Sequence, residues 1–155
     1  MGPVLRLQGR TGAKVTLLVD TSVWSLALRR DVVATEAEVE ALKASLLGDE
    51  VVVTTGIVLQ ELLQGFSGPK SRQQIVERFT SLALIQPDRE DHIEAAGIRN
   101  TCRKAGVQIG TVDALIAQIC VRHDLVLLST DKDFLYAAQH CKLQVWPSRA
   151  VKSHQ

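Results

Sequence analysis

The chain has 155 residues, and 46% of them are hydrophobic, which suits a single compact domain with a sizeable core. Its 18 Lys and Arg residues and 17 Asp and Glu residues give a formal net charge of +1. This near balance excludes a polycation that coats nucleic acid or an anionic membrane through bulk charge. No apolar run reaches the roughly 18 residues needed to cross a bilayer, and residues 1–15 lack the apolar segment of a signal peptide. We therefore expect a cytoplasmic protein that makes no contact with a membrane.

Apolar runs of strand length alternate along the chain with segments of helical periodicity. In chain order the predicted elements are a strand at Leu17–Val19, a helix after Asp20, a helix from Thr35 to Gly48, a strand at Val51–Thr54, a helix from about Thr55 to Gly65, a helix from about Ser71 to Ser81, a strand at Leu82–Ile85, a helix from Asp88 to about Ala105, a helix from Thr111 to His123, a strand at Val126–Leu128, a short helix after Asp131 and a strand at Leu143–Trp146. The strands are continuous apolar runs separated by helices, which predicts an α/β fold with a parallel sheet covered on both faces.

Polar residues at the predicted helix starts are interpreted as caps. Thr35 and Glu38 have the spacing of a capping box, while Asp88 and Thr111 precede two later helices. The three cysteines, at positions 102, 120 and 141, form no CxxC pair, which indicates reduced thiols. The four histidines stand far from one another and from any cysteine, so no structural zinc site is expected.

Two carboxylates follow directly on predicted strands. Asp20 comes immediately after the first strand, and Asp131 follows the fourth after only two residues, with Asp133 close behind. Ligands of open α/β sheets bind beyond the carboxyl ends of the strands, so these acids are candidates for a binding site. For either residue alone, a helix cap or an Asx turn is an equally ordinary interpretation.

Two further acids are embedded in apolar helices. At about 100° per residue, Glu61 falls at the rim of the buried face of its helix, and Asp113 lies on the shoulder of the buried stripe of its own. Asp113 also stands in the first turn, where the helix dipole favours a negative charge. Neither acid has a basic residue three or four positions away, so some other group must balance its charge.

If these acids converge, a cation must neutralise them, because crowded carboxylates raise one another's proton affinity. An all-oxygen set suits Mg²⁺ or Mn²⁺, which commonly work beside phosphate groups. The chemistry that such a site serves best is phosphodiester hydrolysis.

Four segments carry a family resemblance: LLVDTSVW, VLQELLQG, TVDALIAQ and LLSTDKDF. They closely resemble the four motifs of PIN-domain ribonucleases, above all the VapC toxins, and the resemblance extends from about Leu17 to Trp146. It implies a three-layer α/β/α fold with a central five-stranded parallel sheet, and a Mg²⁺- or Mn²⁺-dependent endoribonuclease that cleaves a structured RNA such as tRNA or rRNA. It also implies a homodimer and a cognate antitoxin protein. The acids that fall on the family's catalytic and metal-binding positions are Asp20, Glu61, Asp113 and Asp131, with Asp133 on a secondary metal position and Thr21 or Ser22 on a polar one.

The expected organisation is an extension over residues 1–15, the PIN domain over residues 16–147 and a tail over residues 148–155.

Three other functions would each fit a part of the sequence. A phosphate loop at residues 9–14 lacks the motif's full spacing, and a haloacid-dehalogenase phosphatase would need an acid where Ser22 stands. A receiver-like domain that binds Mg²⁺ without cutting RNA is the serious alternative, although it gives no role to Glu61.

Contacts to RNA are expected from basic side chains, because the aromatic residues are scattered and offer no stacking platform. Trp24 and Leu28, one helical turn apart, suit a partner groove or ordinary core packing equally well. The candidate RNA contacts, which are as readily explained as solvated surface charges, are Arg29, Arg30, Arg103, Lys104, Arg122 and Lys132.

Overall fold

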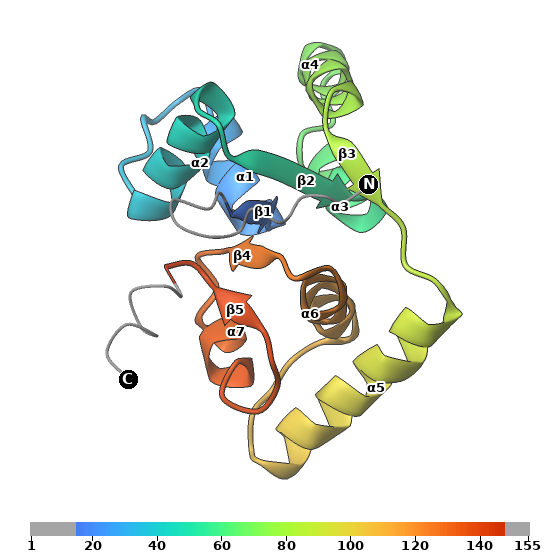
Figure 1. The fold of residues 1–155 in the computed structure, drawn as a ribbon. Coiled ribbons are helices and arrows are strands. Elements are labelled where there is room, and N and C mark those ends of the chain that lie inside the picture. Colours follow the sequence, from blue (N-terminus) through green and yellow to red (C-terminus); the bar gives the residue numbers. More distant parts are fainter. Residues whose placement is uncertain (1–14, 148–155) are drawn as a thin grey trace.

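A computed structural model describes residues 15–147 (Figure 1). Residues 1–14 and 148–155, which include most of the expected extension and all of the expected tail, lie outside the described range, as does the weighed phosphate loop. The elements are β1 (Thr16–Val19), α1 (Thr21–Leu28), α2 (Ala37–Leu47), β2 (Val51–Thr55), α3 (Gly56–Gly65), α4 (Pro69–Thr80), β3 (Ala83–Ile85), α5 (Arg89–Lys104), α6 (Thr111–His123), β4 (Val126–Leu128), α7 (Lys132–Ala137) and β5 (Gln144–Val145).

The five strands form one sheet in the order β3-β2-β1-β4-β5, and each neighbouring pair is parallel. The predicted α/β fold is therefore confirmed. Receiver-like domains have the strand order 2-1-3-4-5, so the receiver alternative is wrong for this chain. Strand order reverses between β1 and β4, where Val19 pairs with Leu128 at the carboxyl ends of both strands. A ligand site is expected at this reversal.

The direction of the crossovers produces the three layers. From β1 the chain steps to β2 and then to β3, and afterwards it returns past β1 to β4 and β5. Parallel crossovers are right-handed, so α1 to α4 cover one face of the sheet and α5 to α7 cover the other, with α1 and α2 opposite α6 and α7 in Figure 1.

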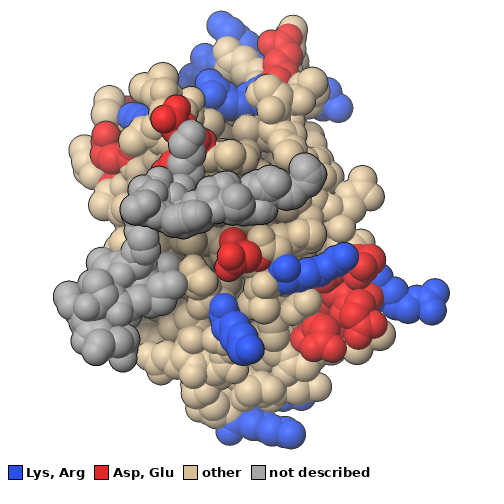
Figure 2. All heavy atoms as spheres, in the orientation of Figure 1, with Lys and Arg blue, Asp and Glu red and all other residues tan. Residues whose placement is uncertain are grey.

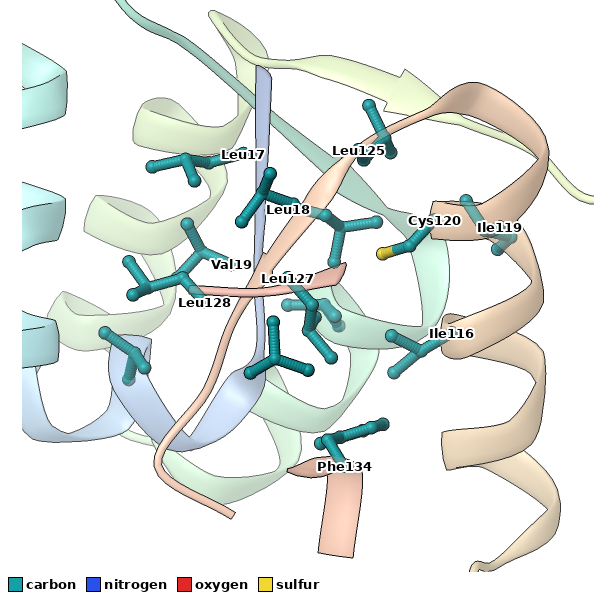
Figure 3. Close-up of a cluster of buried hydrophobic side chains, with 14 of the residues drawn as sticks. Leu17, Leu18, Val19, Ile116, Ile119, Cys120, Leu125, Leu127, Leu128 and Phe134 are labelled. Atoms are coloured by element: carbon teal, nitrogen blue, oxygen red, sulfur yellow. The ribbon is translucent and has the colours of Figure 1, made fainter. Parts of the chain in front are cut away.

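Strands β1 and β4 lie at the centre of the hydrophobic core. Leu18 and Val19 of β1 and Leu127 and Leu128 of β4 have no exposed surface. Figure 3 shows three side chains of α6 directed toward these strands: Ile116, Ile119 and Cys120. Burial on both faces explains why the two strands are continuous apolar runs. The packing of the core thus fixes the positions of the ends of β1 and β4.

The edge strand β3 is less covered than the sequence predicts. Ala83 and Leu84 are exposed and Ile85 is half-buried. Val51, the first residue of β2, is also exposed, although the apolar run predicts that it is buried. The difference arises because β3 has a neighbour on one side only and the chain then crosses to the opposite face.

Two predicted caps are wrong. Helix α2 begins one residue later than expected, with Glu36 in the capping position and no side-chain cap, so Thr35 and Glu38 form no capping box. Helix α6 starts after Gly110, whose carbonyl accepts the first helical hydrogen bond from Ala114 at 2.9 Å, and Thr111 is the first residue of the helix. Glycine is acceptable in a capping position, and exposed amide groups at a helix start can bind water instead.

Helix α5 begins as predicted, and a buried acid ties it to α6. Asp88 caps α5 and forms a capping box with Asp91. Asp91 has no exposed surface, and its carboxylate accepts hydrogen bonds from Gln118 at 3.3 Å and from Arg122 at 2.5 Å, both on α6. Arg122 also contacts Asp88 at 3.0 Å. These polar contacts fix the start of α5 against α6.

The remaining sequence expectations concern cysteines and membranes. Cys102, Cys120 and Cys141 are free thiols, as predicted. No helix within residues 15–147 is long and apolar enough to span a bilayer.

Candidate active site

Asp20 stands directly after β1, with its carboxylate almost buried at 7% exposure. It caps α1, so the helix-cap interpretation is correct for this residue. One oxygen, Oδ2, accepts three hydrogen bonds: from the Ser22 hydroxyl at 2.7 Å, the Ser129 hydroxyl at 2.9 Å and the Ser22 amide at 3.4 Å. The backbone amide of Asp20 donates to the carbonyl of Leu128 at 2.9 Å, which ties the end of β1 to the end of β4.

Asp131 and Asp133 lie beyond the end of β4. Asp131 is half-buried and caps α7, because its Oδ1 accepts a hydrogen bond from the Asp133 amide at 2.9 Å. Asp133 is exposed in the first turn of that helix. Capping therefore accounts for the backbone position of Asp131, as it does for Asp20.

Glu61 is half-buried on α3, as its place at the rim of the apolar face predicts, whereas Gln60 and Gln64 are exposed. Its balancing contact is neutral: the Thr21 hydroxyl of α1 donates to Glu61 Oε1 at 2.7 Å. Of the two polar residues after Asp20, Thr21 thus holds Glu61 and Ser22 holds Asp20. Asp20 and Glu61 therefore have separate hydroxyl partners.

Asp113 is half-buried in the first turn of α6. The pKa of its carboxyl group is raised from 3.8 to about 6 by burial first and then by four negative charges, those of Asp20, Asp131, Glu61 and Asp133. The dipole at the start of α6 favours the ionised form, but burial and like charge outweigh it.

The structure thus places all five predicted acids around one end of the sheet. Their mutual influence is clearest at Asp113, because the charges of the other four acids all raise the pKa of its carboxyl group. Sequence reasoning missed one contributor, Ser129. In the sequence it is only a spacer between β4 and Asp131, and no periodicity distinguishes it.

A hard divalent cation fits these residues by donor chemistry. All five acids offer carboxylate oxygens, which Mg²⁺ and Mn²⁺ prefer, and the charges that raise the pKa of Asp113 call for a positive neighbour. As placed in the part of the chain that the structure describes, no three acidic, histidine or cysteine side chains stand close enough to hold one ion. Mg²⁺ usually keeps several waters and takes one or two protein carboxylates, so a three-carboxylate cage is not required.

Cysteine chemistry does not contribute to this site. Burial raises the pKa of the Cys120 thiol, and the charge of Asp20 raises it further. A thiol that stays protonated is a poor nucleophile and a poor metal ligand. The acids remain the chemically competent groups.

Basic side chains are dispersed over the face of the molecule that Figure 2 shows. On the face in Figure 2, Lys and Arg side chains lie beside Asp and Glu side chains and form no continuous positive surface. Of the candidate RNA contacts, Arg122 is bound to Asp88 and Asp91, and Arg29 pairs with Asp31 at 3.3 Å. Trp24 is 1% exposed and packs on Phe79 in the core, which excludes it from a partner groove.

Several solved structures have the same fold as this chain. FitAcB from Neisseria gonorrhoeae contains a chain 25% identical to this one, with a TM-score of 0.65 and coverage of 83% of this chain and 95% of that chain. For VapBC2 from Rickettsia felis, bound to a promoter DNA fragment, the identity is 20%, the TM-score 0.66 and the coverage 84% and 97%. For VapC20 from Mycobacterium tuberculosis, a Sarcin-Ricin loop cleaving toxin, these values are 20%, 0.60, and 82% and 98%.

A family model supplies the assignment that the fold alone leaves open. The model of the PIN domain matches residues 17–139, which is most of the chain and spans all five acids. The resemblance carried by the four sequence motifs is thereby confirmed, and the chain belongs to the PIN domain family.

Proposed function

We propose that this protein is a Mg²⁺- or Mn²⁺-dependent endoribonuclease and the toxin of a toxin–antitoxin pair. The observation that carries the proposal is the placement of five carboxylates around the carboxyl ends of β1 and β4, where their charges help to raise the pKa of Asp113 to about 6. A protein keeps so many acids together at a cost in stability, and this cost is typical of functional sites. Membership of the PIN domain family supports the proposal that these acids share a role in hydrolysis.

Each acid has a distinct place in the proposed mechanism. A bound divalent ion would supply a Lewis acid that stabilises negative charge on the scissile phosphate. Asp20 and Asp113 would hold the ion, because Asp20 is fixed at the end of β1 and the pKa of Asp113 is raised by the charges of the other four acids. Asp131 and Glu61, which are half-buried, and the exposed Asp133 complete the acidic group. The Thr21 hydroxyl keeps Glu61 Oε1 turned toward α1.

The proposed partners follow the same relatives. VapBC2 shares its name with the VapBC family of toxin-antitoxin systems, and VapC20 is named as a Sarcin-Ricin loop cleaving toxin. We infer a cognate antitoxin, a structured RNA substrate such as tRNA or rRNA, a homodimer and action in the cytoplasm. An arginine inserted by the antitoxin among the acids would silence the site, because a guanidinium pairs well with carboxylates.

Metal removal tests the proposal. In total cellular RNA with mapped ends, EDTA should stop cleavage, and either Mg²⁺ or Mn²⁺ should restore it. Ca²⁺ should occupy the acids yet support little turnover, because it coordinates loosely and activates water poorly. The control is the Asp113→Asn variant purified in parallel, which reveals any contaminating nuclease.

Cleavage that persists in EDTA while the control stays inactive would overturn the metal-dependent mechanism. A metal-independent ribonuclease would then need a general base such as His123 or His140, both of which are exposed.

A further inference from the structure

Two serine hydroxyls from opposite ends of the chain converge on the same oxygen of Asp20. Ser22, in α1, donates to Oδ2 at 2.7 Å, and Ser129, at the end of β4, donates to it at 2.9 Å. The two hydroxyl oxygens are 3.3 Å apart. Ser129 is 6% exposed, so its hydroxyl has little access to water as an alternative partner.

Each hydroxyl is itself oriented by a backbone amide from the segment that carries Asp131. The Thr130 amide donates to Ser22 Oγ at 3.1 Å, and the Asp131 amide donates to Ser129 Oγ at 3.0 Å. Because the hydroxyl oxygens accept from these amides, their protons are directed to the carboxylate. Hydrogen bonds linked in this way strengthen one another in a low-dielectric site.

This arrangement distinguishes the two oxygens of Asp20. A carboxylate oxygen has two lone pairs, and Oδ2 already accepts bonds from two hydroxyls and, at 3.4 Å, from the Ser22 amide. Within the described residues, every hydrogen bond to this carboxylate ends on Oδ2. Oδ1 is therefore the oxygen left for a cation.

We propose that Ser129 is a positioning residue that fixes the Asp20 carboxylate with Oδ1 available as a ligand and holds Asp131 in register with it. The inference rests on the proposed function, because it concerns the same site. Ser129 can do this because one hydroxyl joins the ends of β1 and β4 across 109 positions of sequence. Outer partners of metal ligands typically change metal affinity or activity by about 10- to 100-fold when they are removed.

The test compares Ser129→Ala with Ser45→Ala. Ser45 is a matched control, because it is also 6% exposed and its hydroxyl also donates to a carboxylate at 2.9 Å, that of Glu50, away from the acids. Calorimetric titration with Mn²⁺ measures affinity without RNA, and thermal unfolding measures stability. We expect Ser129→Ala to bind Mn²⁺ about tenfold more weakly, and Ser45→Ala to bind it as the wild type does.

Two further measurements separate positioning from a general structural role. In the metal-free protein, the Asp131 amide should exchange with solvent faster in Ser129→Ala, because its acceptor has been removed. Ser129→Thr, which keeps a hydroxyl, should recover most of the lost Mn²⁺ affinity. Similar losses of stability in both alanine variants, with a loss of affinity in Ser129→Ala alone, are the expected result.

Three outcomes would overturn the inference, and they are distinguishable. If the wild type binds Mn²⁺ and cuts RNA but Ser129→Ala has the same affinity, the positioning role alone is wrong. If the wild type neither binds Mn²⁺ nor cuts RNA in its presence, the proposed function fails and the positioning role fails with it. If Ser129→Ala and Ser45→Ala lose affinity equally, the effect is one of stability and the inference is also overturned.

Discussion

Asp113 is the residue at which burial and like charge act together. Burial is the largest cause that raises the pKa of its carboxyl group to about 6, and the charge of Asp20 is the next. Because this pKa lies within the range of ordinary buffers, the protonation of Asp113 can be followed directly. Its response to pH also reports whether the acids stay together in solution.

A folded-state pKa above the unfolded value means that the folded protein holds the proton more strongly. The ionised carboxyl group therefore destabilises the metal-free fold, and the cost grows as pH rises from about 4 to about 6. Urea unfolding should show Asp113→Asn gaining stability over the wild type across this interval and keeping the gain above it. The control is Asp31→Asn, at an exposed site where Arg29 lowers the pKa. An Asp113→Asn gain that does not change with pH would contradict the assignment.

Saturating Mg²⁺ should lower the Asp113 pKa, because a cation favours the ionised carboxylate. Carbon NMR of the side-chain carboxyl group, with and without Mg²⁺, measures the shift. The Asp91 carboxyl group, on the start of α5, should titrate equally in both conditions. An Asp113 pKa unaffected by Mg²⁺ would mean that the ion does not bind beside it.

Asp20→Asn and Asp113→Asn should each abolish metal-dependent RNA cleavage and leave the fold intact. Removing one of several crowded like charges relieves repulsion, so the circular dichroism spectrum should be unchanged and the melting temperature equal or slightly higher. Cleavage of a defined RNA substrate, measured on folded protein, decides the matter. Full activity in either variant would show that the two acids do not share a site.

The acids could be found in the sequence, and so could Thr21 and Ser22, but the third hydroxyl partner, Ser129, could not. Glu61 and Asp113 are visible because a charge at the edge of an apolar helical face is unusual. Ser129 is an ordinary residue between a strand and a cap, and its role depends on the pairing of β1 with β4. No local pattern shows which hydroxyl will meet which carboxylate.

At the scale of elements, the contact between α5 and α6 depends on a buried charge. Burial opposes ionisation of Asp91, but hydrogen bonds from the Asp88 amide, Gln118 and Arg122 together hold its pKa below the ordinary value. A depressed pKa contributes stability above the unfolded value, and this stability is lost as pH falls through the folded value. Helix α6 carries Asp113, so the contact also supports the site.

Asp91→Ala should therefore lower the free energy of unfolding by about 3 kcal/mol at neutral pH, because it removes a buried carboxylate with several donors. Asp88→Ala, which removes an exposed cap, should lower it by about 1 kcal/mol. The difference between the two variants should shrink in acid. Denaturant titrations at pH 7 and at low pH measure it, and equal losses at both pH values would refute the role of the charge.

The strands are predicted well and the helix starts less well, for a physical reason. A buried strand must be apolar throughout, so β1 and β4 are read directly from composition. A helix start depends on which carbonyl accepts the first helical hydrogen bond. The residue in this position is Glu36 for α2 and Gly110 for α6, next to Thr35 and Thr111, which the sequence favours. Exposure of β3 is likewise set by its place at the sheet edge.

At the scale of the whole molecule, several large apolar side chains remain exposed, among them Leu84 of β3 at 40%, Val76 of α4 at 39% and Ile93 of α5 at 55%. Exposed apolar surface of this kind is typical of contacts between subunits. We predict a homodimer as the active form. Light scattering at micromolar concentration should give twice the monomer mass, and a monomer with full RNA cleavage would show that pairing is dispensable.

The strand order also bears on how such a protein is made. β1 is synthesised well before its neighbour β4, because β2, β3, α5 and α6 lie between the two strands in the sequence. The acids that follow β4 are synthesised later still. Asp20 meets Ser129 across 109 positions, so a nascent chain that stops short of β4 lacks two of the five acids and one neighbour of its central strand β1. Under the proposed function, cleavage would therefore begin only after β4 has been synthesised, and a protective partner supplied before that point would be in time.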